Sequence, residues 1–339
     1  MKSIVQNKMQ WFRQHQKLLT GLAFLAAVCL PLVFNSSYAQ GILTKIVIYA
    51  ITASGLNIIN GYSGQTNLGM AGFMCVGSYT AAILNAYFGV PTFLCICLGA
   101  AFTGVVGLLV SLPTLRLSGT FLTIITLGFS ETIRLIAINW TSVTNGTLGI
   151  KGLPSLSLFG FTVKSGAPYY WFVLAVLVVT LFFLSRILNS RVGRAWVSIR
   201  EDQDAARSLG VEAARYKSIN FIIGALVGGL GGTLMLFYYR YTAPDMFILD
   251  EGFSVLSMVT VGGTGTLIGP LLGSILINLI TEVLRFAAEF RLVLYAVLII
   301  ATMWLRPQGL AGASDSNIAN AAGFKWKRRK ERAAHERNS

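Results

Sequence analysis

The sequence predicts an all-α fold, a polytopic integral membrane helical bundle of about ten transmembrane helices. Hydrophobic residues make up 54% of the 339 residues and charged residues only 12%, which is about half the charged fraction of soluble domains. Mean hydropathy is +0.66. Apolar runs recur from Leu18 to Leu305, each near the length of about twenty residues that crosses a bilayer as a helix. A soluble enzyme is therefore excluded.

The net charge is +14, and the placement of the basic residues along the chain indicates membrane topology rather than nucleic-acid binding. Basic residues gather before the first apolar run, in one central loop and in the tail. They are Lys2, Lys8, Arg13 and Lys17; Arg186, Arg191, Arg194, Arg200, Arg207, Arg215 and Lys217; and Lys325, Lys327, Arg328, Arg329, Lys330 and Arg332. The positive-inside rule assigns such segments to the cytoplasmic side. We therefore expect both termini in the cytoplasm, a basic tail that contacts anionic lipid, and no nucleic-acid partner.

Three regions follow from this pattern. They are a cytoplasmic basic arm at 1–17, a transmembrane domain at 18–310 with a cytoplasmic loop at 189–216, and a basic tail at 311–339. The residues Ser37-Tyr38-Ala39 resemble a signal-peptidase site. We expect a retained signal-anchor helix instead, because the first apolar run is long for a signal peptide and many more follow.

The first five expected spans alternate with short loops. They are Leu18–Phe34, Ile42–Asn60, Leu68–Phe88, Thr92–Leu112 and Gly119–Asn139. The fifth carries Glu131 and Arg134, which lie three residues apart on one helical face and can form an ion pair. The alternative is a role for these charges in a solute pathway, because ionisable groups inside a membrane are costly.

The second half begins with a polar outer loop at Trp140–Pro168 and contains five further expected spans. They are Tyr169–Leu188, Lys217–Tyr239, Phe253–Val261, Pro270–Leu284 and Leu292–Leu305. Eight complete spans remain the alternative, if the eighth and ninth segments are half-helices that re-enter the membrane.

Two series of glycines at four-residue spacing predict close helix packing. They are Gly224, Gly228 and Gly232 in the seventh span, and Gly265, Gly269 and Gly273 between the eighth and ninth.

The residues 61–67, GYSGQTN, interrupt an apolar region with polar side chains and two glycines. Lipid-facing backbone cannot lose its hydrogen bonds, so such a break lies within protein or beside a watery cavity. The candidate solute-pathway residues here are Asn57, Asn60, Tyr62, Ser63, Gly64, Gln65 and Asn67. An ordinary short loop between two spans is the alternative. A weakly similar glycine-containing break occurs at 262–265, GGTG. Paired glycine-interrupted segments in the two halves of a chain indicate the binding region of a transporter.

The central loop contains a candidate docking helix at Arg200–Gly210. Acidic residues occupy its first turn and a glycine follows its end. Both features stabilise a short helix, through the helix dipole and the C-cap. Ala205, Ala206 and Leu209 are expected to form one apolar patch. A helix this short is unstable alone, so we expect a partner surface.

Three segments carry a family resemblance: Gly55–Ala82, Gly193–Phe221, and the residues from Ser254 to Gly273 with Leu305–Leu310. They resemble the inner-membrane permease subunits of bacterial high-affinity branched-chain amino acid importers of the ABC type, more the M-type than the H-type. The likeness spans about 41–310. Permeases for urea and short amides share this skeleton, so the substrate stays open.

The resemblance implies a multi-pass permease in the bacterial inner membrane. It also implies its partners: a second homologous permease, two ATPase subunits and a solute-binding protein. The docking helix resembles the coupling helix of ABC permeases at Ala205, Ala206 and Gly210. The expected ATPase-coupling residues are Arg200, Glu201, Asp204, Ala205, Ala206, Leu209 and Gly210.

The sequence itself lacks the parts of a catalytic or metal site. It has no Gly-Lys-Ser or Gly-Lys-Thr phosphate-binding motif, and its two histidines, His15 and His335, lie in the terminal arms. We expect no enzyme activity, no metal and no cofactor in this chain, with ATP used by partner subunits. The alternative is a self-contained secondary transporter or channel that uses Glu131, Arg134, Glu282 and Arg285.

Overall fold

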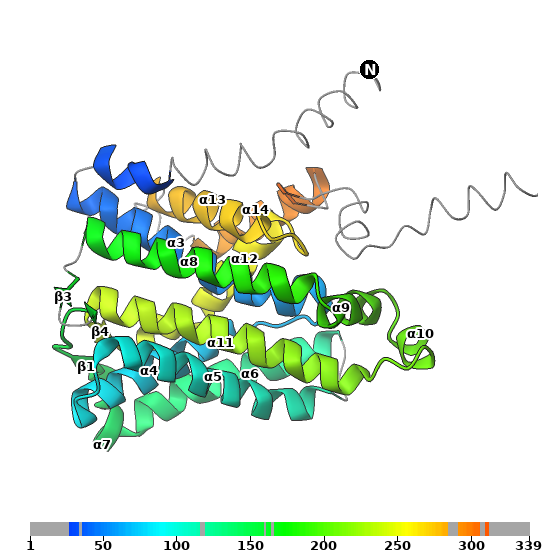
Figure 1. Ribbon diagram of the computed structural model, residues 1–339, viewed down its shortest axis with the longest axis horizontal. Coiled ribbons are helices and arrows are strands. Elements are labelled where there is room, and N and C mark those ends of the chain that lie inside the picture. Colours follow the sequence, from blue (N-terminus) through cyan, green and yellow to red (C-terminus); the bar gives the residue numbers. More distant parts are fainter. Residues whose placement is uncertain are drawn as a thin grey trace, which may run out of the picture.

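The computed structural model describes residues 27–33, 36–115, 119–158, 161–163, 166–283, 291–305 and 309–311. Most of its elements are helices, and the four strands among the described residues are two residues long each (Figure 1). The basic arm at 1–17, most of the first expected span, Arg285 and nearly all of the tail lie outside the described residues. The predicted all-α membrane fold is confirmed by the remainder.

The first four labelled helices correspond to the second to fifth expected spans. They are α3 (Ser37–Asn57), which continues into the π-helical turn η1 (Ile58–Tyr62), then α4 (Met70–Phe88), α5 (Thr92–Thr114) and α6 (Thr120–Asn139). The expected start of the second span at Ile42 was wrong by five residues, since helix begins at Ser37. The apolar pattern marks only the part of a helix that lipid or protein buries.

The labelled helices of the second half differ widely in length. They are α8 (Ala167–Leu188), α9 (Arg191–Glu201), α10 (Gln203–Ser208), α11 (Ala213–Tyr239), α12 (Leu249–Gly262), α13 (Gly269–Val283) and α14 (Arg291–Leu305). Within the described residues, five helices are long and apolar enough to cross a membrane: α3 with η1, α5, α6, α8 and α11.

Helix α12 is shorter than a full crossing. It has 14 residues, or about 21 Å at about 1.5 Å per residue, against about 30 Å of hydrocarbon. Gly273 lies against the Met258 carbonyl and Gly269 against Gly263, so α13 folds back along α12. This geometry favours the broken or re-entrant segments that the sequence left as an alternative for the eighth and ninth spans.

Short strands and turns cap one end of the bundle, a feature that the apolar pattern of the sequence did not predict. They are α7 (Thr141–Thr144), η2 (Gly146–Leu148), β1 (Ile150–Lys151), β2 (Ser157–Leu158), β3 (Phe161–Thr162), β4 (Tyr241–Thr242) and η3 (Pro244–Phe247). β1 pairs antiparallel with β4, and β2 with β3. The β1–β4 pair ties the loop after α6 to the segment after α11. Helices α9 and α10 lie at the opposite end (Figure 1).

Helix α11 occupies the centre of the bundle, between α3 on one side and α4 and α5 on the other (Figure 1). Its glycines allow this: Gly224 faces Gly55 and Ile59, Gly228 faces Met70, and an added Cβ at Gly232 would collide with the Met74 carbonyl. Small residues at such crossings let helix backbones approach closely, which increases van der Waals contact in lipid.

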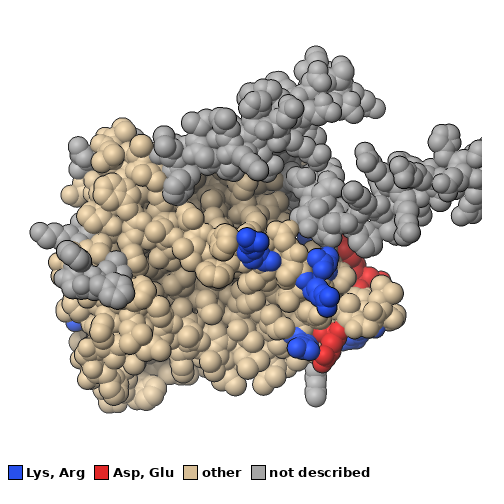
Figure 2. Space-filling view, in the orientation of Figure 1, with Lys and Arg blue, Asp and Glu red and all other residues tan. Residues whose placement is uncertain are grey.

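Charged side chains are unevenly distributed over the surface. On the face drawn in Figure 2, most Lys, Arg, Asp and Glu side chains gather toward the end that carries α9 and α10, and the rest of that face is largely free of them. Large apolar side chains are exposed on the sides of the bundle, among them Phe102, Leu109, Val179 and Phe183. An apolar belt of this kind faces lipid rather than water.

Candidate functional site

The two broken segments are in direct contact. The side chain of Asn57, only 2% exposed, accepts a hydrogen bond from Gly265 N at 2.9 Å and donates one to the Thr266 carbonyl at 2.8 Å. Gly61 lies so close to Gly265 that a Cβ there would collide with its backbone. Asn57 therefore supplies hydrogen-bond partners to backbone that has left the helix between α12 and α13.

A second amide network holds the break itself. Gln65 donates from Nε2 to Ser63 Oγ at 2.6 Å and to Asn220 Oδ1 at 3.4 Å. Asn220 in turn donates to the Ile58 carbonyl at 3.0 Å, in the π-helical turn. Asn220 is fully buried and was missed in the sequence analysis. Its signal was a lone amide within an apolar span, where polar groups need partners.

Asn67, also in the break, has a side-chain donor without a hydrogen-bond partner among the described residues. Asn67 donates its backbone N–H to Asn60 Oδ1 at 3.1 Å, and its own Oδ1 accepts from Gly69 N at 2.7 Å. Its side-chain nitrogen Nδ2 is buried without a hydrogen-bond partner among the described residues. An unpaired buried N–H group costs free energy of about 1–3 kcal/mol. The other side-chain amides of the break described above are hydrogen-bonded within the protein, and Asn67 Nδ2 is the exception among the described residues.

The break also touches the central loop. Arg200 of α9 donates from Nη1 to the Gly61 carbonyl at 2.8 Å and from Nη2 to Glu201 at 2.8 Å. The backbone of Gly64, at φ +68°, lies against the Arg200 side chain. Tyr62 is 9% exposed beside them. The break therefore lies at the α9 end of the bundle rather than midway along it (Figure 1).

The candidate docking helix is two helices, not one. Asp202 is extended (φ −159°), and its carboxylate accepts from Asp204 N at 2.9 Å and Ala205 N at 3.0 Å. This N-cap starts α10, so Arg200 and Glu201 belong to α9. The prediction of a continuous helix from Arg200 to Gly210 was wrong, because an Asp can end one helix and cap the next.

The expected apolar patch is divided between two faces of α10. Ala206 is 2% exposed and packs with Ile199 and Ala213 of the same chain. Ala205 is exposed and Leu209 is 84% exposed. The prediction of a single patch was therefore wrong. The exposed apolar surface here consists of Ala205 of α10 and Leu209, the C-cap residue that follows α10. Gly210 follows at φ +84°.

The charged pair predicted in the fifth span is formed. Arg134 donates from Nε to the two carboxylate oxygens of Glu131 at 3.1 and 3.0 Å. Each charge is therefore neutralised by the other. Among the described residues, no three His, Cys, Asp or Glu side chains gather in a group that could hold a metal ion.

Comparison with known proteins gives consistent matches over most of the chain. A family model described as "Branched-chain amino acid transport system / permease component" matches residues 38–303. The high-affinity branched-chain amino acid transport system permease protein LivM of Salmonella typhimurium is 34% identical over 318 residues, which cover 87% of this chain and 75% of that protein. The permease protein LivH of the same kind of system in Escherichia coli is 26% identical over 295 residues, 79% of this chain and 92% of that protein.

One solved structure aligns with most of the chain. It is described as an inward-facing conformation of a metal-chelate type ABC transporter. The alignment has a TM-score of 0.48 and 17% identity, and it covers 86% of this chain and 98% of that chain.

Proposed function

The chain belongs to the family of branched-chain amino acid transport permeases, and from that membership we propose that it is the transmembrane permease subunit of an ABC importer. It is a multi-pass membrane transport subunit. Its proposed substrates are branched-chain or related neutral amino acids, delivered by a solute-binding protein. Its proposed location is the bacterial inner membrane, with both termini and the loop 189–216 in the cytoplasm.

The structural observation that carries the coupling part of this proposal is the hydrogen bond from Arg200 to the Gly61 carbonyl. An importer driven by separate ATPases must pass movement from a cytoplasmic docking element to the membrane segments. Here α9 and α10 form a charged unit at one end of the bundle (Figure 2), and α9 is bonded to the broken segment after α3. This arrangement supports a coupling role for α9 and α10.

The proposed ATPase contact is the free face of α10, with Ala205 and Leu209 as its apolar part. Leu209 exposes 84% of its surface, which is unfavourable in water and is relieved by burial against a partner. Energy comes in this proposal from two ATPase subunits, because the sequence holds no Gly-Lys-Ser or Gly-Lys-Thr motif. A second, homologous permease completes the proposed complex, and this chain itself binds no cofactor.

The proposed solute path passes the polar break. Asn57, Ser63 and Gln65 bond to neighbouring protein groups, so within the proposal they hold the shape of the break. Among the described residues, Asn67 Nδ2 is a donor of the break without a hydrogen-bond partner, and it suits a carboxylate or carbonyl oxygen of a passing solute. The proposal needs neutral donors here, since a fixed charge would hold a zwitterion too firmly.

The test is uptake by the complex that copurifies with a tagged chain. We expect two ATPase subunits and a second permease in that complex. We also expect ATP-dependent uptake of radiolabelled leucine into proteoliposomes in the presence of the binding protein. Uptake of urea in place of leucine would assign the chain to the amide permeases. Uptake that follows an ion gradient with no ATPase bound would overturn the ABC proposal.

A further inference from the structure

Helix α6 is the least buried of the five helices that are long and apolar enough to cross a membrane. Among the described residues, 22% of its apolar stretch is buried, against 72% for α11. The buried residues lie on one side of α6, where Gly69 and Gly72 of α4 approach Thr126 and Ser130. The opposite side, here called the open face of α6, is not covered by this chain.

The open face carries a regular row of exposed residues. They follow one another at alternating steps of four and three residues, and they are Phe121, Ile125, Gly128, Thr132 and Leu135. Residues at this spacing lie along one stripe of a helix and are typical of a seam that packs against a second helix. An added Cβ at Gly128 would meet no atom within 4 Å. The middle of the row therefore has room for another helix backbone to approach closely.

An ion pair at membrane depth borders this row. Glu131 is eleven residues beyond Thr120, the first residue of α6, which is about 17 Å along the helix axis and near the middle of a bilayer of about 30 Å. The side chain of Glu131 is 40% exposed and that of its partner Arg134 is 20% exposed. Charged side chains within membrane segments almost always face protein or water. The pair therefore indicates that the open face does not lie against lipid.

Large apolar side chains occupy the same face before and after the pair. Phe121 is 69% exposed and Ile124 59%, and Leu135 and Ile136 are 45% and 47% exposed. Contact of so much apolar surface with a water-filled path is unfavourable. A helix of a second membrane protein suits both kinds of side chain, because it can bury the apolar ones and hydrogen-bond to the charged ones.

The exposed sides of α5 and α8 do not share this combination. The polar residues Thr103 of α5 and Thr180 of α8 are buried. Exposed side chains in the middle of these helices are apolar, as is typical of contact with lipid. They are Leu98, Ala101, Phe102, Val105, Leu108 and Leu109 in α5, and Ala175, Val178, Val179, Phe182 and Phe183 in α8.

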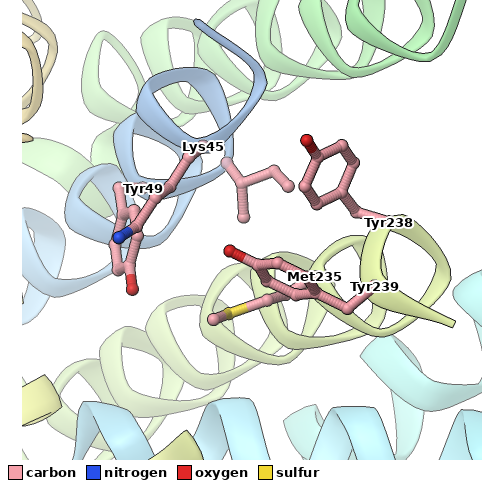
Figure 3. A pocket seen from close by; sticks show the side chains of 6 residues that line it. Lys45, Tyr49, Met235, Tyr238 and Tyr239 are labelled. Carbon is pink, nitrogen blue, oxygen red and sulfur yellow. The ribbon is translucent and has the colours of Figure 1, made fainter. Parts of the chain in front are cut away.

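Lys45 of α3, another cation within a membrane helix, does not mark a second contact surface. Its ammonium nitrogen lies 5.7 Å from the centroid of the Tyr49 ring, which stabilises the charge by a cation–π contact. Figure 3 shows the two side chains together at one side of a space that is lined further by Ile48, Met235, Tyr238 and Tyr239. The chain therefore accommodates Lys45 with its own residues.

We propose that the open face of α6 is the surface on which the second, homologous permease subunit packs, with the Glu131–Arg134 pair enclosed at its edge. The inference rests on the proposed function and adds to it the helix that makes the contact. Of the proposed partners, the second permease is the one that lies at membrane depth, since the ATPases and the solute-binding protein act at the two ends of the bundle. Thr132 and Leu135 contact a helix of the partner, and a polar group of the partner binds the exposed side of Glu131.

The first test measures the surroundings of a spin label at position 132 in the complete permease complex. Thr132→Cys is made in a chain whose exposed Cys29 and Cys97 are replaced by serine. We expect the label to be shielded both from oxygen, which concentrates in lipid, and from a water-soluble nickel complex. Val179→Cys on α8, whose wild-type side chain is 53% exposed, is the matched control and should be open to oxygen.

The two other outcomes of this measurement contradict the proposal. Oxygen access at position 132 equal to that at position 179 would place α6 against lipid. High access of the nickel complex would place the open face along a water-filled path. Either result overturns the contact with the second permease.

The second test inserts a bulky side chain into the proposed contact. Thr132→Trp should lower the amount of second permease that copurifies with a tagged chain at least several-fold, because a packed contact does not tolerate added volume. Thr132 is exposed, so the yield of monodisperse tagged chain should stay at the wild-type level. Val179→Trp should retain the second permease. Wild-type copurification by Thr132→Trp would overturn the proposal.

A photo-cross-link identifies the partner directly. With p-benzoylphenylalanine at position 125, we expect a covalent adduct whose mass spectrum matches the copurifying second permease, and we expect none from position 179. An adduct with a second copy of this chain would overturn the homologous partner. If no second permease copurifies with the wild-type chain, the proposed complex itself fails. A second permease that copurifies while position 125 gives no adduct and position 132 faces lipid would leave the proposed function intact and overturn only this surface.

Discussion

Arg200 and Gly61 are 139 residues apart in the chain, and the guanidinium of the first donates a 2.8 Å hydrogen bond to the carbonyl of the second. The acceptor lies in the π-helical turn η1, where the regular ladder of α3 is disturbed. The donor lies in α9, which is joined through the Asp202 cap to α10. The bond therefore joins α9 directly to the turn that begins the polar break.

Arg200→Ala should uncouple ATP hydrolysis from transport. The substitution removes a charge-assisted hydrogen bond worth about 1.5–3 kcal/mol, while the free face of α10 stays unchanged. We expect normal complex assembly and ATPase activity, with leucine uptake reduced at least several-fold. Uptake and ATP hydrolysis are measured on the same proteoliposomes.

Arg207→Ala is the control for this prediction. Arg207 is also in the loop 189–216, but its ion pair with Asp204 is exposed and 3.5 Å long, a kind of pair worth little. Uptake should stay near the wild-type rate. Equal uptake by Arg200→Ala and the wild type would show that the Arg200 bond carries no coupling.

Asn57→Leu should destabilise the folded permease. The leucine would leave Gly265 N and the Thr266 carbonyl without their side-chain partner, at a cost of about 1–3 kcal/mol for each buried group. We expect a lower temperature of unfolding in detergent, measured by tryptophan fluorescence or by loss of monodisperse protein. Asn139→Leu is the control, since that amide is exposed and donates to the Leu135 carbonyl of its own helix. Unfolding of Asn57→Leu at the wild-type temperature, together with slow uptake, would instead favour a direct contact between Asn57 and the solute.

The long helices were predictable from the sequence and the contact between the two breaks was not. Apolar runs predicted α4, α5 and α6 nearly at their observed bounds. A helix that crosses lipid needs apolar residues in each of its turns, so its length is visible in the sequence. The contact between Asn57 and Gly265 is visible in the sequence only as one polar residue and one glycine, which are 208 residues apart. The division of α10 into a buried Ala206 and an exposed Leu209 depends on the packing of α9, which no local pattern encodes. The strand pair β1–β4 is two residues long, too short to show alternation.

The orientation of the bundle is tested by cysteine labelling. Ser208 in α10 and Ser142 in α7 are both exposed and lie at opposite ends of the bundle. The positive-inside rule assigns the α10 end to the cytoplasm. An impermeant maleimide added to intact cells or spheroplasts should label Ser142→Cys and not Ser208→Cys, again with Cys29 and Cys97 replaced by serine. Inverted vesicles should give the reverse pattern. Labelling of both positions from one side would refute the proposed topology.

Substitutions at Ala206 of α10 and at Leu209, the residue that follows α10, should give different defects. Ala206 is buried against Ile199 and Ala213, so Ala206→Leu overfills a packed site, and overpacking costs about 1–3 kcal/mol. We expect it to disturb α10 and lower the thermal stability of the loop, which is measured by proteolysis between Arg191 and Arg215. Leu209 is 84% exposed in the isolated chain, so Leu209→Ala removes nothing from the fold. We expect it to leave proteolysis unchanged and to weaken ATPase copurification, because the partner would lose the apolar side chain that it buries. Arg207→Ala, on the same short helix, should retain both properties. Unchanged ATPase binding by Leu209→Ala would mean that the free face of α10 is not the docking surface, whatever the outcome at Ala206.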